Sequence, residues 1–390
     1  LVALARALAG HGVELVSTGG TARALREAGL EVVDVAAVSG RPEILDGRVK
    51  TLQPEIHGGI LARRADPAHM AVLAEHGIGT IDLVVVNLYP FARTRASGED
   101  SAACIENIDI GGPAMIRAAA KNHEDVAILT DPADYPKLVE ALARGGTDGA
   151  FRQGLARKAF AHTAAYDAAI ASWLAGLDGP ALPDPLLVAA PRQQTLRYGE
   201  NPHQAGALHA WPQGRPGVAM ARQLQGKELS YNNFQDADAA VELVAGFARP
   251  TVVIVKHTNP CGVASAATLH EAWERALAAD PVSAFGGIVA CNRPIDLATA
   301  EGLAGLFLEV VAAPGFAPEA LERLAAKANL RLLALDRLPG PGDAMLDVRS
   351  IGGGLLVQAR DTTTSDPAGW ATVTKRAPTA EERAALAFAW

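Results

Sequence analysis

The first half of the chain alternates short apolar segments with segments of helical pattern. The apolar segments are rich in Val, Ile and Leu and lie at 13–17, 31–35, 81–88 and 126–130. Continuous apolar runs are typical of strands buried on both faces, and strands separated by helices favour a parallel sheet with helices on both sides. The sequence therefore predicts an α/β fold built around a parallel sheet.

A proline-rich stretch divides the chain. The fifteen residues 177–191 contain four prolines and follow a helical pattern at 151–174. The length of 390 residues also exceeds the ~250–300 residues beyond which chains usually split into domains. We therefore predict a first domain at 1–176, a linker at 177–191 and a second domain at 192–390.

The second domain again mixes strands with helices. TVVIVKHTNPCG predicts a strand that runs into a polar turn, LHEAWERALAAD predicts a helix, and SAFGG leads into the strand IVACN. Helices are expected around 297–328, and NLRLLAL and GGLLVQ predict further strands. Both ends of the chain, LVALARALAG and EERAALAFAW, lie within helical patterns. We therefore expect a fragment that is truncated at both termini.

The composition excludes several classes of protein. With 49% hydrophobic and 20% charged residues, the chain can form cores and is not disordered. A net charge of −8 argues against a nucleic-acid partner, and no apolar run reaches the ~18 residues that would span a bilayer. Cys104, Cys261 and Cys291 are too few for a disulfide framework, which predicts a reducing, cytoplasmic location.

Two loops of the first domain could bind an anion. Thr18–Thr21 (TGGT) lies between a strand and a helix, where paired glycines let several N–H groups converge on an anion. In Gly47–Leu52 (GRVKTL), Arg48 and Lys50 flank one valine in a chain with only eight lysines. A plain strand–helix turn and a solvated basic loop remain alternative interpretations of these two segments.

Further polar residues of the first domain surround a predicted helix at 113–121. Asn87 and Tyr89 follow a predicted strand, at the end where open α/β sheets bind ligands. Asp109 precedes two glycines and a proline that suits the first turn of a helix. Lys121 is roughly 12 Å further along that helix, so it cannot easily serve an anion held at the start of its own helix. A partner of the helix dipole is the simpler interpretation of Lys121.

In the second domain, Lys256 and His257 follow a strand directly. A base beside a positive charge can remove a proton while developing negative charge is stabilised, although an ordinary surface pair is the alternative. Arg197-Tyr198-Gly199 and Asn201-Pro202-His203 form another polar cluster to which spacing alone assigns no role. No paired Cys or His spacing typical of a metal site occurs, so no metal is expected.

Together these segments resemble one family, the bifunctional purine biosynthesis proteins that combine AICAR transformylase with IMP cyclohydrolase. AICAR is aminoimidazole carboxamide ribonucleotide and IMP is inosine monophosphate. The resemblance rests on ordered motifs that cover nearly the whole chain: STGGTA, GRVKTL, HGGIL, VVVNLYPF, ENIDIGGP, IRAAAKNH, LRYGENPHQ, GKELSYNN, VKHTNPCG, DPVSAFGG and GGLLVQ.

The resemblance implies that the first domain has a methylglyoxal-synthase-like fold. It would close formylated AICAR (FAICAR) to IMP, with loss of water and without a cofactor. By resemblance, Lys121 is the proton donor and acceptor, and Lys50, Tyr89 and Asp109 line the reacting end. The residues that would hold the nucleotide are Thr18, Gly19, Gly20, Thr21, Arg48, Val49, Thr51, Asn87, Ile110, Gly111 and Gly112.

The second domain resembles a cytidine-deaminase-like transformylase that lacks zinc. It would move a formyl group from the co-substrate 10-formyltetrahydrofolate to AICAR. The AICAR amine is a poor nucleophile, and by resemblance His257 is the base and Lys256 stabilises the transition state. The residues that match substrate-binding positions are Arg197, Tyr198, Asn233, Phe285, Gly286 and Glu309. The family also implies a homodimer and chemistry that requires no metal.

One residue of the first domain differs from the residue that the family usually has. Gln53 stands where the family usually has His; an amide can hydrogen-bond a ligand but cannot titrate. With both ends truncated, we expect weakened nucleotide binding and poor transformylase activity.

The main alternative function is a methylglyoxal-synthase-like nucleotide-binding or regulatory module without catalysis, which need not retain Lys121 with Lys50. A zinc deaminase is the second alternative, but most of its metal signature is missing.

Overall fold

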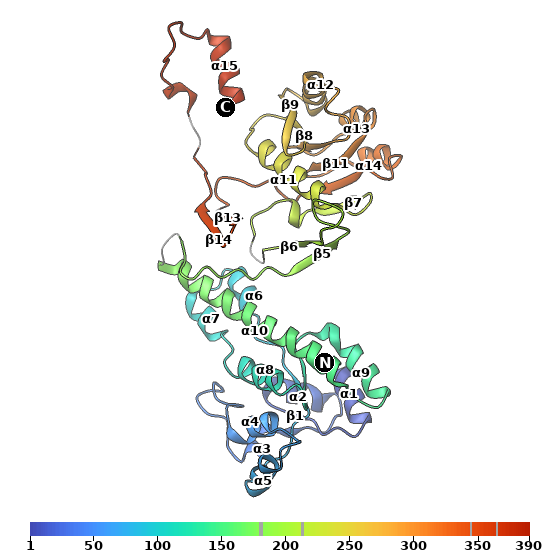
Figure 1. Cartoon of the computed structure of the whole chain (residues 1–390), viewed down its shortest axis with the longest axis vertical. Helices are drawn as coiled ribbons and strands as arrows, with labels where there is room; N and C mark the ends of the chain where they lie inside the picture. The colour runs from blue at the N-terminus through green and yellow to red at the C-terminus, as the bar shows by residue number, and fades with distance from the viewer. Residues whose placement is uncertain (179–181, 212–213, 344, 364–365) are drawn as a thin grey trace. The chain divides into compact units, whose positions relative to one another are not determined.

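The computed structural model divides the chain into two compact units, Leu1–Ala189 and Ala190–Trp390 (Figure 1). The division falls inside the predicted linker at 177–191, of which residues 179–181 lie outside the described residues. The structure describes residues 1–178, 182–211, 214–343, 345–363 and 366–390.

The first unit alternates helices with short strands, and its two pairs of strands, β1–β2 and β3–β4, are parallel. Its elements are α1 (Val2–Gly10), β1 (Val16–Ser17), α2 (Gly19–Glu27), β2 (Val33–Asp34), α3 (Val35–Ser39), α4 (Pro54–Leu61), α5 (Pro67–Glu75), β3 (Leu83–Val85), α6 (Phe91–Ala96), α7 (Ser101–Glu106), α8 (Gly111–Lys121), β4 (Ala127–Leu129), the 3₁₀ helix η1 (Pro132–Asp134), α9 (Tyr135–Ala143) and α10 (Gly149–Asp178).

These strands are shorter than the apolar segments that predicted them. The segment 31–35 ends its strand at Asp34, because the Asp34 carboxylate accepts the N–H of Ala36 and caps α3. The strand within 126–130 is buried at every position and is covered by α8 and α10. Ile116 and Leu129 are fully buried in this core, where one such side chain contributes about 1.5–3 kcal/mol.

The second unit contains most of the β-structure. Its elements are β5 (Arg192–Leu196), β6 (Gly206–His209), the 3₁₀ helix η2 (Val218–Met220), β7 (Arg222–Gln225), α11 (Tyr231–Ala245), β8 (Thr251–Lys256), β9 (Asn259–Ser265), α12 (Leu269–Ala279), β10 (Gly287–Cys291), α13 (Leu297–Ala304), β11 (Leu308–Ala313), α14 (Pro318–Ala325), β12 (Arg331–Ala334), β13 (Leu346–Ile351), β14 (Gly354–Ala359), the 3₁₀ helix η3 (Pro367–Gly369) and α15 (Ala380–Ala389).

Six of these strands form one mixed sheet in the order β7-β12-β11-β10-β8-β9. The strands β10, β11 and β12 are parallel to one another, whereas β8 and β9 form an antiparallel hairpin. The prediction of helices throughout 297–328 is wrong at β11, which separates α13 from α14. Its sequence LEVVAA is apolar except for Glu309, and the strand lies between two other strands with all of its other residues buried.

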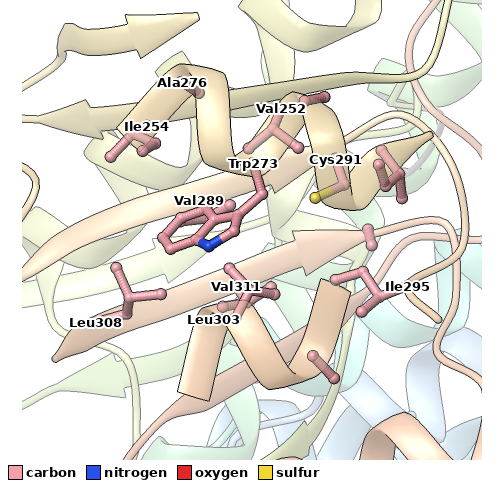
Figure 2. Packing of buried hydrophobic residues seen from close by; sticks show 14 of the residues in the cluster. Val252, Ile254, Trp273, Ala276, Val289, Cys291, Ile295, Leu303, Leu308 and Val311 are labelled. Atoms are coloured by element: carbon pink, nitrogen blue, oxygen red, sulfur yellow. The ribbon is translucent and has the colours of Figure 1, made fainter. Parts of the chain in front are cut away.

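Alternate residues of this sheet enter different cores. Val252 and Ile254 of β8 pack against α12 and α13 on one face, whereas Val253 and Val255 pack against α11 on the other. Figure 2 shows the indole of Trp273, from α12, among the aliphatic side chains of the first face. The result is a sheet with helices on both sides, and its strand ends position the second site.

The last part of the described chain forms a separate hairpin, β13–β14, followed by α15. The ring of Phe388 in α15 lies 5.3 Å from that of Phe247, and Arg360 forms an ion pair with Glu242 of α11. Within the described residues, none of the helices combines the length and the apolar character needed to cross a membrane.

Candidate functional site

The TGGT segment forms the start of α2. Thr18 is the extended residue before the helix, and its side chain makes no capping hydrogen bond within the described structure. Gly19 has a φ of 56°, and a methyl group added there would lie 3.7 Å from Lys50 Nζ. The free N–H groups of this first turn therefore lie beside a lysine, which is an arrangement suited to a phosphate.

The GRVKTL segment is a tight loop in which both cations have carboxylate partners. Lys50 Nζ lies 3.3 Å from Glu43 Oε2, and Arg48 forms an ion pair with Glu106 of α7. Gly47 has a φ of 89°, and a methyl group there would lie 2.9 Å from Lys50 Nζ. The backbone conformation of this position therefore favours glycine, which leaves room for the ends of the Glu43 and Lys50 side chains.

Thr51 and Gln53 connect this loop to α8 and α4. A methyl group added at Gly111 would lie 2.8 Å from Thr51 Oγ1, so the GRVKTL segment meets the start of α8. Gln53 is buried at the start of α4, and its Oε1 has no hydrogen-bond partner within the described structure. The amide that departs from the family therefore has an acceptor that the described structure does not use.

Asp109 is fixed immediately before α8. Its Oδ1 accepts the N–H of Gly112 at 2.8 Å, and its own N–H donates to the hydroxyl of Tyr166 at 2.8 Å. That hydroxyl in turn donates to the carbonyl of Asn107 at 3.1 Å. Burial raises the pKa of Tyr166, so the hydroxyl keeps its proton and can make both bonds. Sequence reasoning missed Tyr166, because it lies 57 residues from Asp109.

The other predicted residues of the first unit lie at the ends of the strands. The Asn87 side chain follows β3 and donates to the Tyr135 hydroxyl at 2.9 Å. The side chains of Tyr89 and Ile110 are both more than half exposed, at 51% and 61%, so a ligand could contact either one. The structure thus brings the TGGT loop, Lys50 and Thr51 toward the start of α8, where Asp109 lies.

Lys121 lies apart from this group, at the opposite end of α8. It lines a cavity of about 690 Å³ between α4, α8 and α10, together with Arg117, Arg157 and His57. Arg117 lies 5.5 Å over the ring of Phe160. Burial lowers the pKa of His57, which favours a neutral imidazole in this otherwise basic cavity. Lys121 is therefore separated from the start of α8 by the length of the helix, as the sequence predicted.

In the second unit, Lys256 and His257 lie at the tip of the β8–β9 hairpin. A polar turn was predicted after β8, but the sequence analysis missed the strand β9, which begins at Asn259. Lys256 Nζ donates to the carbonyl of Phe285 at 2.9 Å. The ring of Phe285 is 57% exposed and lies 5.2 Å from that of Phe307. A partly stacked aromatic pair beside a lysine could contact an aromatic substrate.

Strand register brings three predicted segments together at the same end of the adjacent strands β8, β10 and β11. The carboxyl end of β8, with Lys256, is adjacent to the amino end of β10, and Gly287 in turn pairs with Leu308 of β11. Gly286 and Glu309 therefore lie near these strand ends. Glu309 forms an ion pair with Arg331 at 2.5 Å, so a substrate would have to share or displace that partner.

Asn233 and the Arg197-Tyr198 pair flank α11 and β5. The Asn233 side chain accepts the N–H of Ser230 at 3.1 Å in a capping box, so it is already used in part by the fold. Arg197 and Tyr198 directly follow β5, and no described contact joins them to His257. Sequence reasoning missed Asp236 of α11, whose carboxylate accepts hydrogen bonds from the backbone N–H groups of His257 and Thr258.

The cysteines and potential metal ligands give no sign of a metal centre in the described part of the chain. No group of three His, Cys, Asp or Glu side chains gathers there. Cys104 and Cys291 are buried, and all three cysteines are free.

Comparison with known families identifies the chain. A family profile described as "AICARFT/IMPCHase bienzyme" matches residues 119–390, and one described as "MGS-like domain" matches residues 1–114. The chain belongs to the AICARFT/IMPCHase bienzyme family. This result confirms the predicted family, the α/β fold with its methylglyoxal-synthase-like amino-terminal domain, and the pairing of a formyltransferase with an IMP cyclohydrolase.

Curated relatives agree with this assignment. The bifunctional purine biosynthesis protein PurH of Dinoroseobacter shibae is 57% identical over 398 residues, which cover 100% of this chain and 75% of the relative. The protein of the same name from Parvibaculum lavamentivorans is 55% identical over 394 residues, covering 100% of this chain and 73% of the relative. A solved structure, titled "Crystal structure of ForH", is 40% identical, covers 46% of this chain and 92% of that chain, and has a TM-score of 0.41.

Proposed function

We propose that the chain catalyses the last two steps of IMP formation in purine biosynthesis, with the residue roles given below. AICAR receives a formyl group from 10-formyltetrahydrofolate, and the resulting FAICAR then closes to IMP with loss of water. The family match carries the reaction classes. The arrangement around Asp109 and Lys50 supports catalysis over the alternative of a binding module, because a module without chemistry would need only the phosphate contacts.

The first unit would carry out the ring closure. The first turn of α2, beside Lys50, would hold the nucleotide phosphate. The carboxamide nitrogen of FAICAR then attacks the formyl carbon, and the oxygen of that carbon leaves as water. Asp109 and Tyr89 would orient the reacting groups, and Lys121 would move the proton. Holding both groups of one molecule in contact supplies much of the acceleration of such a reaction.

The second unit would carry out the formyl transfer. The AICAR amine attacks the formyl carbon of the folate, His257 accepts the amine proton, and tetrahydrofolate leaves. The ammonium of Lys256 would stabilise the negative charge that develops on the formyl oxygen. Phe285 would contact the ring of the nucleotide, which is consistent with its exposed aromatic side chain.

We also propose that the protein is a cytoplasmic homodimer. Lys121 is ten residues from Gly111, which is about 15 Å along α8, so one chain does not bring it to the other reacting residues. A second copy could supply the missing lysine. Three free cysteines are consistent with a reducing compartment.

Two matched pairs of variants test these roles. IMP formation from FAICAR, followed by absorbance, should fall at least a hundredfold in Asp109→Asn and stay unchanged in Asp148→Asn, because Asp148 only caps α10. Formyl transfer should be lost in His257→Ala and retained in His270→Ala, since His270 pairs with Glu274 on α12. Wild-type rates in Asp109→Asn or His257→Ala would remove that residue from the mechanism.

A further inference from the structure

The hairpin that carries His257 has an unusual turn. Two residues, His257 and Thr258, join β8 to β9, and their φ angles are 54° and 62°. Two-residue hairpin loops with positive φ at both positions normally contain Asn and Gly. L-residues rarely adopt this left-handed conformation, and a β-branched threonine is especially disfavoured there. Some other part of the molecule must therefore hold this turn.

The contacts of the turn identify Asp236 as that part. Asp236 Oδ1 accepts the N–H of Thr258 at 2.8 Å, and its Oδ2 accepts the N–H of His257 at 3.3 Å. One carboxylate thus bonds both residues that have positive φ. The carbonyl of His257 accepts two further bonds, from Asn259 Nδ2 at 2.8 Å and from its neighbour's hydroxyl at 2.7 Å. The backbone of His257 is therefore bonded on both sides.

The helix that carries Asp236 is itself firmly packed. Ala237, Ala240 and Val241 of α11 are fully buried against the sheet, and a capping box fixes the start of the helix. The hairpin tip, by contrast, is exposed. Asp236 therefore connects an exposed turn to a rigid element.

The imidazole of His257 depends on this backbone for its position. Within the described part of the chain, its ring nitrogens have no hydrogen-bond or ion-pair partner. A base must lie within hydrogen-bond reach of the proton that it removes, so a change in the turn displaces the base itself.

We propose that Asp236 is a positioning residue for formyl transfer: its carboxylate holds His257 and Thr258 in the left-handed conformation that presents the imidazole to the substrate. The proposal rests on the role proposed for His257. Asp236 does not touch the reacting atoms and acts only through the turn.

The decisive test is a rescue by a second substitution. Asp236→Ala should lower kcat for formyl transfer by tenfold or more, with the KM for AICAR changed less than twofold. Adding Thr258→Gly should restore most of kcat, because glycine adopts a positive φ without the carboxylate. Asp236→Asn should keep an intermediate rate, since its amide oxygen still accepts one N–H. Asp238→Ala, on the same helix, should match the wild type.

A second readout does not depend on turnover. In protein labelled with ¹⁵N at His and Thr, Asp236→Ala should shift the amide signals of residues 257 and 258 and accelerate their hydrogen exchange. Wild-type amide signals in Asp236→Ala, or a loss of kcat that Thr258→Gly does not restore, would overturn the proposal. The His257→Ala variant distinguishes failure of the role proposed for His257 from failure of the role proposed for Asp236. A wild-type rate in His257→Ala refutes the role of His257, whereas the amide signals of Asp236→Ala still test the contact of Asp236 with the turn.

Discussion

Removing one hydroxyl group tests how Asp109 is held. In Tyr166→Phe the ring remains, and with it the edge-to-face contact with Phe91 at 6.3 Å between centroids. The variant loses two hydrogen bonds, the 2.8 Å bond from the Asp109 N–H and the 3.1 Å bond to the Asn107 carbonyl. Leaving a buried backbone group unpaired costs about 1–3 kcal/mol. Both groups here are only partly buried, so the free energy of unfolding should fall by about 1.5–3 kcal/mol in total.

The same loss should appear in catalysis if Asp109 acts at the reacting end. A transition-state penalty of about 1.4 kcal/mol corresponds to a tenfold lower rate, so we expect kcat for IMP formation from FAICAR to fall about tenfold. KM should change little, because the TGGT turn that we propose as the phosphate site is not altered. The assay is the absorbance change on ring closure, together with urea unfolding.

Thr163→Val is the matched control for Tyr166→Phe. Thr163 lies on the same helix, is buried, and donates its hydroxyl to the carbonyl of Phe160 at 3.2 Å. It should lose about 1 kcal/mol of stability with unchanged kcat. The reasoning is refuted if Tyr166→Phe is destabilised but retains the wild-type kcat, or if Thr163→Val loses as much activity.

Three further predictions concern separate features. Gly112→Ala should lower cyclohydrolase activity at least tenfold, because the new methyl group would lie 2.5 Å from Asp109 Oδ2; Gly154→Ala, with open space around it, should match the wild type in the same assay. Lys158 donates a hydrogen bond to Asp131 and thereby lowers the pKa of that carboxyl below 3.8. Lys158→Met should therefore lose about 1 kcal/mol at pH 7, and urea titrations should show the difference from wild type shrinking as the pH falls below about 4. Burial raises the pKa of Cys291 to about 12, so a thiol reagent at pH 8 should label Cys261 well before Cys291 in the folded protein.

Local sequence pattern predicted much of the fold, and tertiary contacts account for its errors. The run in β8 and the helix that contains Trp273 are strongly periodic or strongly apolar, and the structure contains both. The strand β11 was predicted as helix, because its apolar residues lie between two helical segments and a short buried strand cannot be told from a buried helix by periodicity alone.

In the candidate sites, too, local motifs predicted some residues, whereas others are defined only by tertiary contacts. Motifs indicated the TGGT turn and His257, because each follows a predicted strand, and Lys50, because it lies two residues from Arg48 in a chain with few lysines. Tyr166 and Asp236 carry no motif and are defined only by the backbone groups that the fold brings to them. The separation of Lys121 from Asp109 followed from helix geometry alone, since both ends of α8 were predicted.

The most direct test of the central claim is the conversion of FAICAR to IMP by the purified chain and by its Lys121→Ala variant. The wild-type chain should form IMP with the absorbance change of ring closure. The variant should be slower by at least a hundredfold at saturating FAICAR, with an unchanged unfolding midpoint because Lys121 is exposed. Equal rates for the two proteins would contradict the proposed mechanism, and no IMP formation by the wild type would contradict the proposed function.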